Sequence, residues 1–491
     1  MTMEDRLCFA PGDLAGGTPR HAADASGRPS ALARRTVPRA KARRRAAGSS
    51  APLLPPARAR AGRLVPVSKN RRDGTCLIAA SCVSTAESTE ARRVERGLNG
   101  EPERHEYAVA FRTREGFFLF FSSSTFLTPY TSRPFTHTSR QIMNDINDTL
   151  KEAYNATSVI VMPGSGSYGM ESVARQWATG KRVMVLRNGY FSYRWTDIFE
   201  QTGIPSEVIV VKGQPMDNSA QPQFAPHDVD AVVAQIKAEK PAVLFAPHVE
   251  TSTGIILPDD YIKKVAAAMH AHGGLFVLDC IASGTVWVDM KDTGVDCILS
   301  APQKGWTGPA CASLMMLSER GDHATRNTTS TSMVINMRKW LEVMDSYVNG
   351  GFAYYTTMPT DALNLFRDAA LETKEMGFKK AADAAWALGN ECRDMMKSKG
   401  LRTVSAPGFE APGVSVWYTD QPDMFAKFKA KGFQIAAGVP FMINEPAGNF
   451  TFRIGLFGLD KIQHKEKTIK TLETTLEQLL ETEETAKSQA A

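Results

Sequence analysis

VDCILSAPQKGWTG, residues 295–308, predicts a short apolar strand followed by a turn that holds a single lysine, Lys304. Burial at the end of a strand lowers the pKa of an amine, and an amine needs this lower pKa to attack a carbonyl at neutral pH. The stretch therefore suggests a Schiff-base lysine. Taken alone, a lysine in this position is more commonly one that ends a strand and extends its ammonium into water, so the rest of the chain has to separate the two interpretations.

Apolar strands and amphipathic helices alternate before this stretch. Strands are predicted at 158–162, 183–186, 207–211, 242–246, 275–278 and 296–300. Helices are predicted at 140–155, 170–177, 192–202, 228–238 and 259–272. Such alternation is typical of an α/β fold with a mainly parallel sheet covered on both faces, whose ligands bind beyond the carboxyl ends of the strands.

Polar residues follow several of these strands. GSGSYG at 164–169 joins a strand to a helix, which points backbone N–H groups at a phosphate. Asp279 directly follows four apolar residues; a carboxylate there is costly to bury without a cation, although it also fits a helix cap or a turn. An acid, a lysine and a phosphate loop at neighbouring strand ends are what pyridoxal phosphate (PLP) requires. The acid keeps the pyridine nitrogen protonated, the lysine forms the Schiff base and moves the proton, and the loop anchors the phosphate.

The glycine loop also matches the GxGxxG pattern of dinucleotide folds. Such a fold expects an acidic residue about 20 positions later, but the next strand ends in Arg187-Asn188-Gly189, which fits NAD poorly and NADP only through Arg187. An NADP oxidoreductase remains a remote alternative, because it leaves Asp279 and Lys304 without a role.

Residues 125–465 resemble class V PLP-dependent aminotransferases, in particular the alanine–glyoxylate, serine–pyruvate and aminoethylphosphonate–pyruvate transaminases. The matching pieces, in order along the chain, are GSGSYGMES at 164–172, NGYF at 188–191, HVETSTG at 248–254, LDCIAS at 278–283, SAPQKG at 300–305, YYTTMP at 354–359 and FRIGLFG at 452–458. Each piece is short, but their order and spacing together are specific.

The resemblance implies roles for individual residues. Lys304 would be the Schiff-base lysine, Asp279 the partner of the pyridinium, and Arg453 the ligand of the substrate α-carboxylate, for which a planar guanidinium is suited. The implied cofactor-binding residues are Ser165, Gly166, Ser167, Phe191, Thr251, Asp279, Ile281, Gln303, Lys304, Tyr354 and Thr357. Tyr354 and Thr357 would serve the neighbouring subunit, which implies a homodimer with composite sites. No metal site is expected.

The resemblance also implies fold-type I architecture. Residues 121–360 would form the PLP-binding large domain, and residues 361–491 a linking helix and a smaller C-terminal α/β domain. In the second part, the pattern predicts helices within 361–400, strands at 414–418, 433–436 and 450–456, a helix at 422–431 and a closing helix with an apolar stripe.

The predicted activity is the transfer of an amino group from a small amino acid, alanine or serine, to glyoxylate or pyruvate. Two further class V activities stay open: an aminoethylphosphonate–pyruvate transaminase, and a cysteine desulfurase or lyase. Desulfurases that resemble this family place His before the lysine, whereas Gln303 precedes it here. Phe191 stands where the alanine–glyoxylate enzymes often have the Trp that stacks on the cofactor.

The first quarter of the 491-residue chain differs from the rest. Residues 1–120 contain 22 of the 58 basic and 12 of the 52 acidic residues, a net +10, whereas residues 121–491 carry −4. Residues 1–70 are rich in Arg, Ala, Pro and Gly without periodicity, so we expect a basic, disordered leader at 1–120. The alternatives are a targeting leader, a nucleic-acid-binding arm and a misassigned start. Of these, the nucleic-acid-binding arm is disfavoured, so we expect no nucleic-acid partner.

Two further expectations concern the environment of the protein. No apolar run approaches the roughly 18 residues that span a bilayer, so we expect no membrane partner. The seven cysteines form no CxxC pair or regular framework, which suits a reducing compartment. We therefore expect a cytoplasmic protein, or a mitochondrial one if the Arg-rich leader is a targeting segment.

Overall fold

The computed structural model describes residues 107–113, 116–122 and 135–490, and the chain divides into two compact units, 1–122 and 123–491. In the first unit, β1 (Tyr107–Thr113) and β2 (Gly116–Ser122) form an antiparallel hairpin in which Tyr107 lies opposite Ser122. This hairpin was not predicted. The other residues of the predicted leader lie outside the described ranges, so its disorder stays a prediction.

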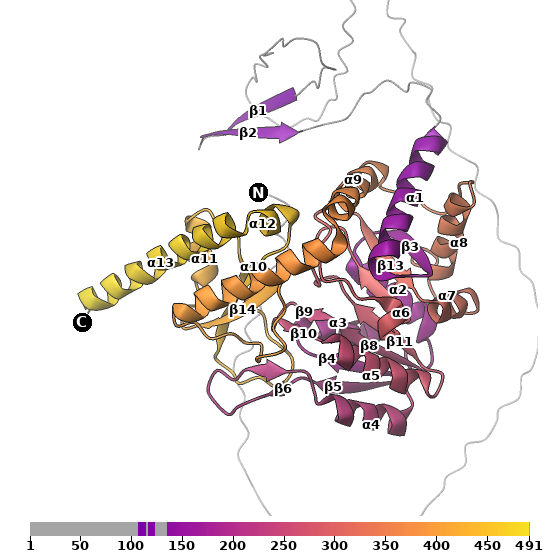
Figure 1. Ribbon diagram of the computed structural model, residues 1–491, viewed down its shortest axis with the longest axis horizontal. Helices are drawn as coiled ribbons and strands as arrows, with labels where there is room; N and C mark the ends of the chain where they lie inside the picture. Colours follow the sequence, from indigo (N-terminus) through magenta and orange to yellow (C-terminus); the bar gives the residue numbers. More distant parts are fainter. Residues whose placement is uncertain (1–106, 114–115, 123–134, 491) are drawn as a thin grey trace, which may run out of the picture. The chain divides into compact units, whose positions relative to one another are not determined.

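The second unit is built around a seven-stranded sheet in the order β3-β13-β12-β11-β8-β4-β5 (Figure 1). Its strands are β3 (Ser158–Pro163), β4 (Arg182–Arg187), β5 (Glu207–Lys212), β8 (Val243–Pro247), β11 (Leu275–Asp279), β12 (Cys297–Ser300) and β13 (Ala312–Leu317). β12, β11, β8, β4 and β5 pair in parallel, while β13 runs antiparallel to both β12 and β3. The mainly parallel α/β sheet is confirmed, and the reversed strand β13 was not predicted.

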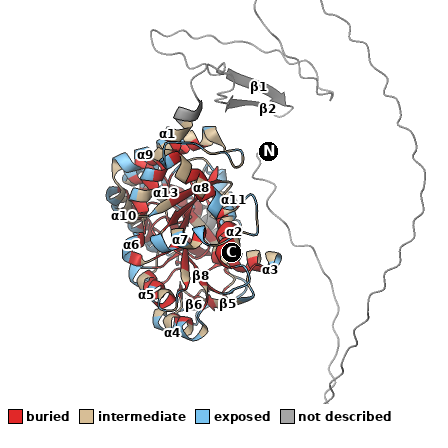
Figure 2. Cartoon of the chain, turned by 90° about the vertical axis from the view of Figure 1, so that its right-hand side faces the viewer, coloured by how far each residue is buried: buried red, intermediate tan, exposed pale blue. Residues whose placement is uncertain are grey.

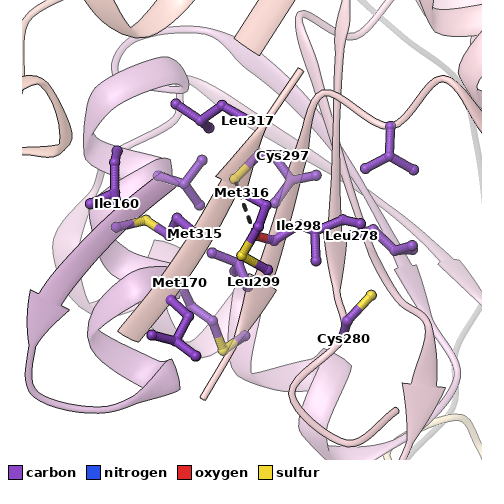
Figure 3. Close-up of a cluster of buried hydrophobic side chains, with 14 of the residues drawn as sticks. Ile160, Met170, Leu278, Cys280, Cys297, Ile298, Leu299, Met315, Met316 and Leu317 are labelled. Carbon is purple, nitrogen blue, oxygen red and sulfur yellow. Dashed lines mark hydrogen bonds between the residues drawn. The ribbon is translucent and has the colours of Figure 1, made fainter. Parts of the chain in front are cut away.

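The strands are continuous apolar runs because helices cover the sheet on both faces. Every residue of β8, β12 and β13 is buried, and buried residues concentrate in the sheet (Figure 2). Figure 3 shows part of this core, where Leu278, Ile298, Leu299 and Met315 from three neighbouring strands pack together. Each such fully buried side chain contributes about 1.5–3 kcal/mol, so this layer fixes the strand ends that carry Asp279 and Lys304.

Eight helices of this unit precede residue 350. They are α1 (Phe135–Tyr154), α2 (Gly166–Trp177), α3 (Tyr190–Thr202), α4 (Val229–Glu239), α5 (Asp259–His270), α6 (Met290–Thr293), α7 (Glu319–Arg326) and α8 (Met337–Val348). The side chains of Asp228, Ser318 and Asn336 accept backbone N–H groups at the starts of α4, α7 and α8, which satisfies part of each helix end. The sequence pattern predicted α1 to α5 but not α6, α7 or α8.

Two long helices lead into the C-terminal domain, α9 (Thr360–Met376) and α10 (Phe378–Ser398), separated at Gly377 with φ 91°. The domain contains β14 (Val414–Thr419), β15 (Ala436–Ala437), β16 (Phe450–Gly455), α11 (Met424–Ala430), α12 (Leu459–Gln463) and α13 (Lys465–Ala490). Its sheet has the order β14-β16-β15. The strand predicted at 433–436 is only the two-residue β15.

The apolar stripe of the closing helix packs inside its own domain, as predicted. One core cluster, which also contains residues of α10, β14 and β16, buries Ile469, Leu472, Leu476 and Leu479 of α13. It also buries Ile462, which was predicted in the same stripe but lies in the separate helix α12. α10 lies beside α13 (Figure 1). Across the described ranges, we find no helix that combines the length and the hydropathy needed to cross a membrane.

Candidate functional site

Loops from several strands meet at one edge of the central sheet. β3, β4, β8, β11 and β12 all point the same way, so their carboxyl ends share that edge. The segments that follow them are the GSGSYG loop, the start of α3, the HVETSTG turn, residues 280–284 and the Lys304 turn. The HVETSTG turn contains the short strand β9 (Val249–Glu250), which pairs antiparallel with β10 (Ile255–Ile256) directly after the turn.

Asp279 is the last residue of β11 and is only 8% exposed. The pKa of its carboxyl is raised from 3.8 to about 6, mainly by burial and also by the negative charge of Glu250, while the N–H of Ile281 and the charge of Arg194 oppose the rise. The Ile281 N–H donates to Asp279 Oδ1 over 2.9 Å. A carboxylate held in this way gains from any cation that is placed against it.

Lys304 lies four residues after the end of its predicted strand, in the turn that follows β12 (Cys297–Ser300). Burial lowers the pKa of its amine, and the neighbouring guanidinium of Arg453 lowers it further. The next residue is held by a close approach of two backbones: a Cβ on Gly305 would lie 2.0 Å from the carbonyl oxygen of Gly284. Only glycine fits there, so the turn that carries Lys304 is locked against the segment after β11.

The GSGSYG loop is open to an anion at the start of α2. Ser165 is the N-cap residue, but its side chain accepts no helix N–H. The Tyr168 N–H donates to the Ser165 carbonyl over 3.0 Å, which leaves the first-turn N–H groups of Gly166 and Ser167 for another acceptor. A Cβ on Gly166 would lie 2.2 Å from Ile281 Cδ1, so the loop packs directly on the segment after Asp279. Gln303 lies beside Lys304, and its Oε1 is buried without a hydrogen-bond partner among the described residues.

Phe191 lies in the first turn of α3, and two arginines lie close to its ring. The guanidinium carbon of Arg194 is 5.2 Å from the centre of its ring and that of Arg453 is 5.6 Å away, both within cation–π range. Arg453 comes from β16 of the C-terminal domain, and its Nε donates to the carbonyl of Ala437 over 2.9 Å. Burial lowers the pKa of Arg453, while the carboxylate of Glu250 opposes this.

Glu250 has no assigned role in the sequence analysis, yet it organises the site. Its carboxylate is fully buried and accepts five hydrogen bonds, from the N–H of Phe191 (3.0 Å), the N–H (2.9 Å) and Oγ (2.7 Å) of Ser192, and the N–H (3.1 Å) and Oγ (2.8 Å) of Ser252. It therefore caps α3 and ties Phe191 to the HVETSTG turn. The cost of burying a carboxylate, which singled out Asp279, is a signal that could also have found Glu250.

Most of the predicted site residues come together. Direct contacts, shared turns or electrostatic coupling join Ser165, Gly166, Ser167, Phe191, Thr251, Asp279, Ile281, Gln303, Lys304 and Arg453. Tyr354 and Thr357 lie instead in the exposed segment between α8 and α9, where Tyr354 is 80% exposed, and we find no contact of either with this cluster in the chain as described. Their role for a neighbouring subunit stays a prediction.

Arg187, on which an NADP site would depend, is already engaged. It is 8% exposed, its Nη2 donates to Thr196 Oγ1 over 2.7 Å, and its guanidinium lies 4.9 Å from the ring centre of Tyr193. It is thus not presented to a ligand phosphate. Among the described residues, no group of three or more His, Cys, Asp or Glu side chains is arranged to hold a metal ion.

Glu250→Gln should lower the free energy of unfolding by roughly 2–4 kcal/mol, because an amide cannot accept from donors on both sides and leaves buried N–H groups unpaired. Urea unfolding would measure this loss. Glu200→Gln is the matched control, since Glu200 is an exposed glutamate on α3, the helix whose start Glu250 caps. Equal stability of the two variants would show that Glu250 does not hold the start of α3.

The chain is similar in sequence and in fold to known aminotransferases. Residues 130–408 match the aminotransferase class-V family. The chain is 27% identical over 350 residues to alanine–glyoxylate aminotransferase 1 of Saccharomyces cerevisiae, covering 67% of this chain and 86% of that protein. It is 29% identical over 335 residues to serine–glyoxylate aminotransferase of Hyphomicrobium methylovorum, covering 64% and 76%. The crystal structure of alanine–glyoxylate aminotransferase from Nostoc sp. shares the fold, with a TM-score of 0.58 at 20% identity over 69% of this chain and 87% of that one.

Proposed function

The chain belongs to the class-V aminotransferase family, and from this we propose that it moves the amino group of a small amino acid, alanine or serine, to glyoxylate or pyruvate. One observation carries the proposal. A buried acid, Asp279, ends β11, and a half-buried lysine, Lys304, lies in the turn that follows the adjacent parallel strand β12; their pKa values are perturbed in opposite directions, and an arginine lies beside the lysine. The names of the relatives supply the choice of substrates.

The residues present fit PLP. Asp279 is a buried carboxylate in need of a cation, and the protonated pyridine nitrogen is one. The open start of α2 offers backbone N–H donors to a phosphate, and the side-chain amide of Gln303 would have to donate through its Nε2 group. When bound, PLP holds the substrate amino group covalently and accepts the electrons released at the substrate α-carbon.

The side chains of the site would divide the work. Burial and Arg453 lower the pKa of the Lys304 amine, which favours the neutral form that acts as a base. Lys304 would therefore remove the substrate α-proton and return it to the cofactor carbon that is bonded to the transferred nitrogen. Arg453 would bind the substrate carboxylate and fix the orientation of the α-C–H bond. Phe191, held by Glu250, would stack on the cofactor ring without donating a hydrogen bond.

A cysteine desulfurase needs an accessible thiolate near the lysine. The cysteines nearest in sequence to Asp279 and Lys304, Cys280, Cys297 and Cys311, are buried, and burial raises the pKa of each thiol. Such thiols are inert. This favours a transaminase over that alternative.

The proposal is tested by supplying a panel of amino donors, including alanine, serine, aspartate, cysteine and aminoethylphosphonate, with either glyoxylate or pyruvate as acceptor. We expect alanine or serine with one of these acceptors to give the highest kcat/KM. Highest kcat/KM with aminoethylphosphonate, or release of sulfide from cysteine without an acceptor, would replace the proposal with one of the other class V activities.

We propose in addition that the enzyme is a homodimer with composite sites. Tyr354 and Thr357 are exposed in one chain, and the resemblance assigns them to the cofactor phosphate of the partner. Mixing inactive Lys304→Ala with inactive Tyr354→Ala/Thr357→Ala should restore activity after subunit exchange, because each mixed dimer gathers both lesions in one site and leaves the other intact. Exchange shown by mass tags without recovered activity would remove both residues from the site.

The cytoplasm is the proposed compartment. The four described cysteines, Cys280, Cys297, Cys311 and Cys392, are free and buried, as suits a reducing environment. Imaging residues 1–120 fused to a fluorescent reporter would separate this from the mitochondrial alternative, which predicts reporter signal inside mitochondria.

A further inference from the structure

Arg194 on α3 is a cation at the phosphate loop to which no role has been assigned. Its Nη1 donates to Ser167 Oγ over 2.9 Å, and its guanidinium lies against the ring of Phe191. The side chain is partly buried, and no carboxylate forms an ion pair with it in the part of the chain that the structure describes. A guanidinium fixed in this way is prepared to receive an anion.

The charge balance of the cofactor site identifies that anion. The residues expected around the phosphate, which carries close to two negative charges near neutral pH, are all neutral: Ser165, Gly166, Ser167, Gln303 and the partner's pair of Tyr and Thr. Lys304 and Arg453 are committed to the reacting carbon and the substrate carboxylate. Among the described residues, Arg194 is the cation that directly contacts the loop.

We propose that Arg194 pairs with the phosphate group of PLP and supplies the positive charge of that subsite. The inference rests on the proposed function in that it takes PLP as the bound cofactor. Phe191 then lies within cation–π range of the cations of both anion sites, Arg194 for the cofactor phosphate and Arg453 for the substrate carboxylate. Arg194 also couples electrostatically to Asp279, so the test must distinguish the phosphate from the ring nitrogen.

Pyridoxal makes this distinction, because it has the ring and the aldehyde of PLP but no phosphate. Dissociation constants of both compounds would be measured with the full-length, cofactor-free protein by quenching of tryptophan fluorescence; Trp306 lies two residues after Lys304. The variants are Arg194→Gln, Arg194→Lys and, as control, Arg175→Gln, an arginine further along α2 that pairs with Glu171.

Arg194→Gln should raise the Kd for PLP about 10- to 100-fold, as expected for the loss of a charge-assisted hydrogen bond, and leave the Kd for pyridoxal within about twofold. Arg194→Lys should fall between wild type and Arg194→Gln, and it keeps the test valid if the glutamine variant does not fold. Arg175→Gln should change neither constant.

Two results would overturn the inference. Equal weakening of PLP and pyridoxal would place Arg194 at the Asp279 end of the site, and unchanged binding of both would leave it outside the site. A wild-type chain that acquires no visible absorbance with PLP would instead overturn the proposed cofactor chemistry, and the inference with it.

Discussion

Lys304→Ala is expected to lower turnover by about 10⁴-fold, at the upper end of what one acid–base group contributes. The structure gives the reason: burial and Arg453 both lower the pKa of this amine, and the close approach of Gly305 to Gly284 fixes its position. Stopped-flow measurement of a single half-reaction with alanine or serine would give the rate.

The fold should survive this change, because the Lys304 side chain makes no hydrogen bond or ion pair with the described residues. Its Nζ lies 6.0 Å from the ring centre of Phe457. Circular dichroism and urea unfolding should match wild type, while the visible absorbance of the lysine-linked cofactor disappears. Lys181→Ala, an exposed lysine before β4, is the control and should retain full activity. Wild-type rates in Lys304→Ala would refute the transaminase proposal.

Periodicity predicted those parts of the fold whose apolar residues repeat strongly. The strands of the central sheet and the helices from 158 to 279 were predicted to within a few residues, because each is a continuous apolar run or an amphipathic segment. The two-residue strands in this range, β6 (Gln214–Pro215), β7 (Phe224–Ala225), β9 and β10, were not predicted. β13 was missed although all six of its residues are buried. Its run, ASLMML, lacks β-branched residues, and nothing local shows that it pairs in reverse with both β12 and β3.

The site divides along the same line. Asp279 and Lys304 could be predicted because Asp279 ends an apolar strand and Lys304 follows one closely. These positions alone indicate that a charged side chain is partly or fully buried. Glu250 and Arg194 could not be assigned in this way, because their importance depends on partners that are distant in sequence. Glu250 accepts from residues 58 and 59 positions earlier in the chain, and Arg194 donates to a residue 27 positions earlier. A sequence shows that an arginine follows Phe191 by three residues, but not that it reaches the phosphate loop.

Asp279→Asn should retain PLP but lower turnover by about 10²- to 10⁴-fold. A neutral amide cannot keep the ring nitrogen protonated, and loss of a buried ion pair is worth about 3–5 kcal/mol. Asp260→Asn, at an exposed position in the first turn of α5, is the matched control and should leave turnover unchanged. Comparable turnover of Asp279→Asn and wild type would show that Asp279 is not the partner of the pyridinium.

The same substitution should stabilise the cofactor-free protein at high pH. The pKa of the Asp279 carboxyl is about 6 in the folded chain and 3.8 without the fold, so between these values the folded chain holds a proton that the unfolded chain has released. Stability therefore falls as pH rises through this window, by roughly 3 kcal/mol in total, and stays lower above it.

Asp279→Asn has no carboxyl at this position, so its stability does not change with pH through this window. At pH 8 the cofactor-free variant should be more stable than cofactor-free wild type by up to this amount, and the advantage should shrink toward pH 4. Urea unfolding of both at pH 4.5, 6 and 8 measures the difference. A difference that does not vary with pH would mean that the carboxylate is not strained by burial, and that the fold does not hold Asp279 ready for a cation.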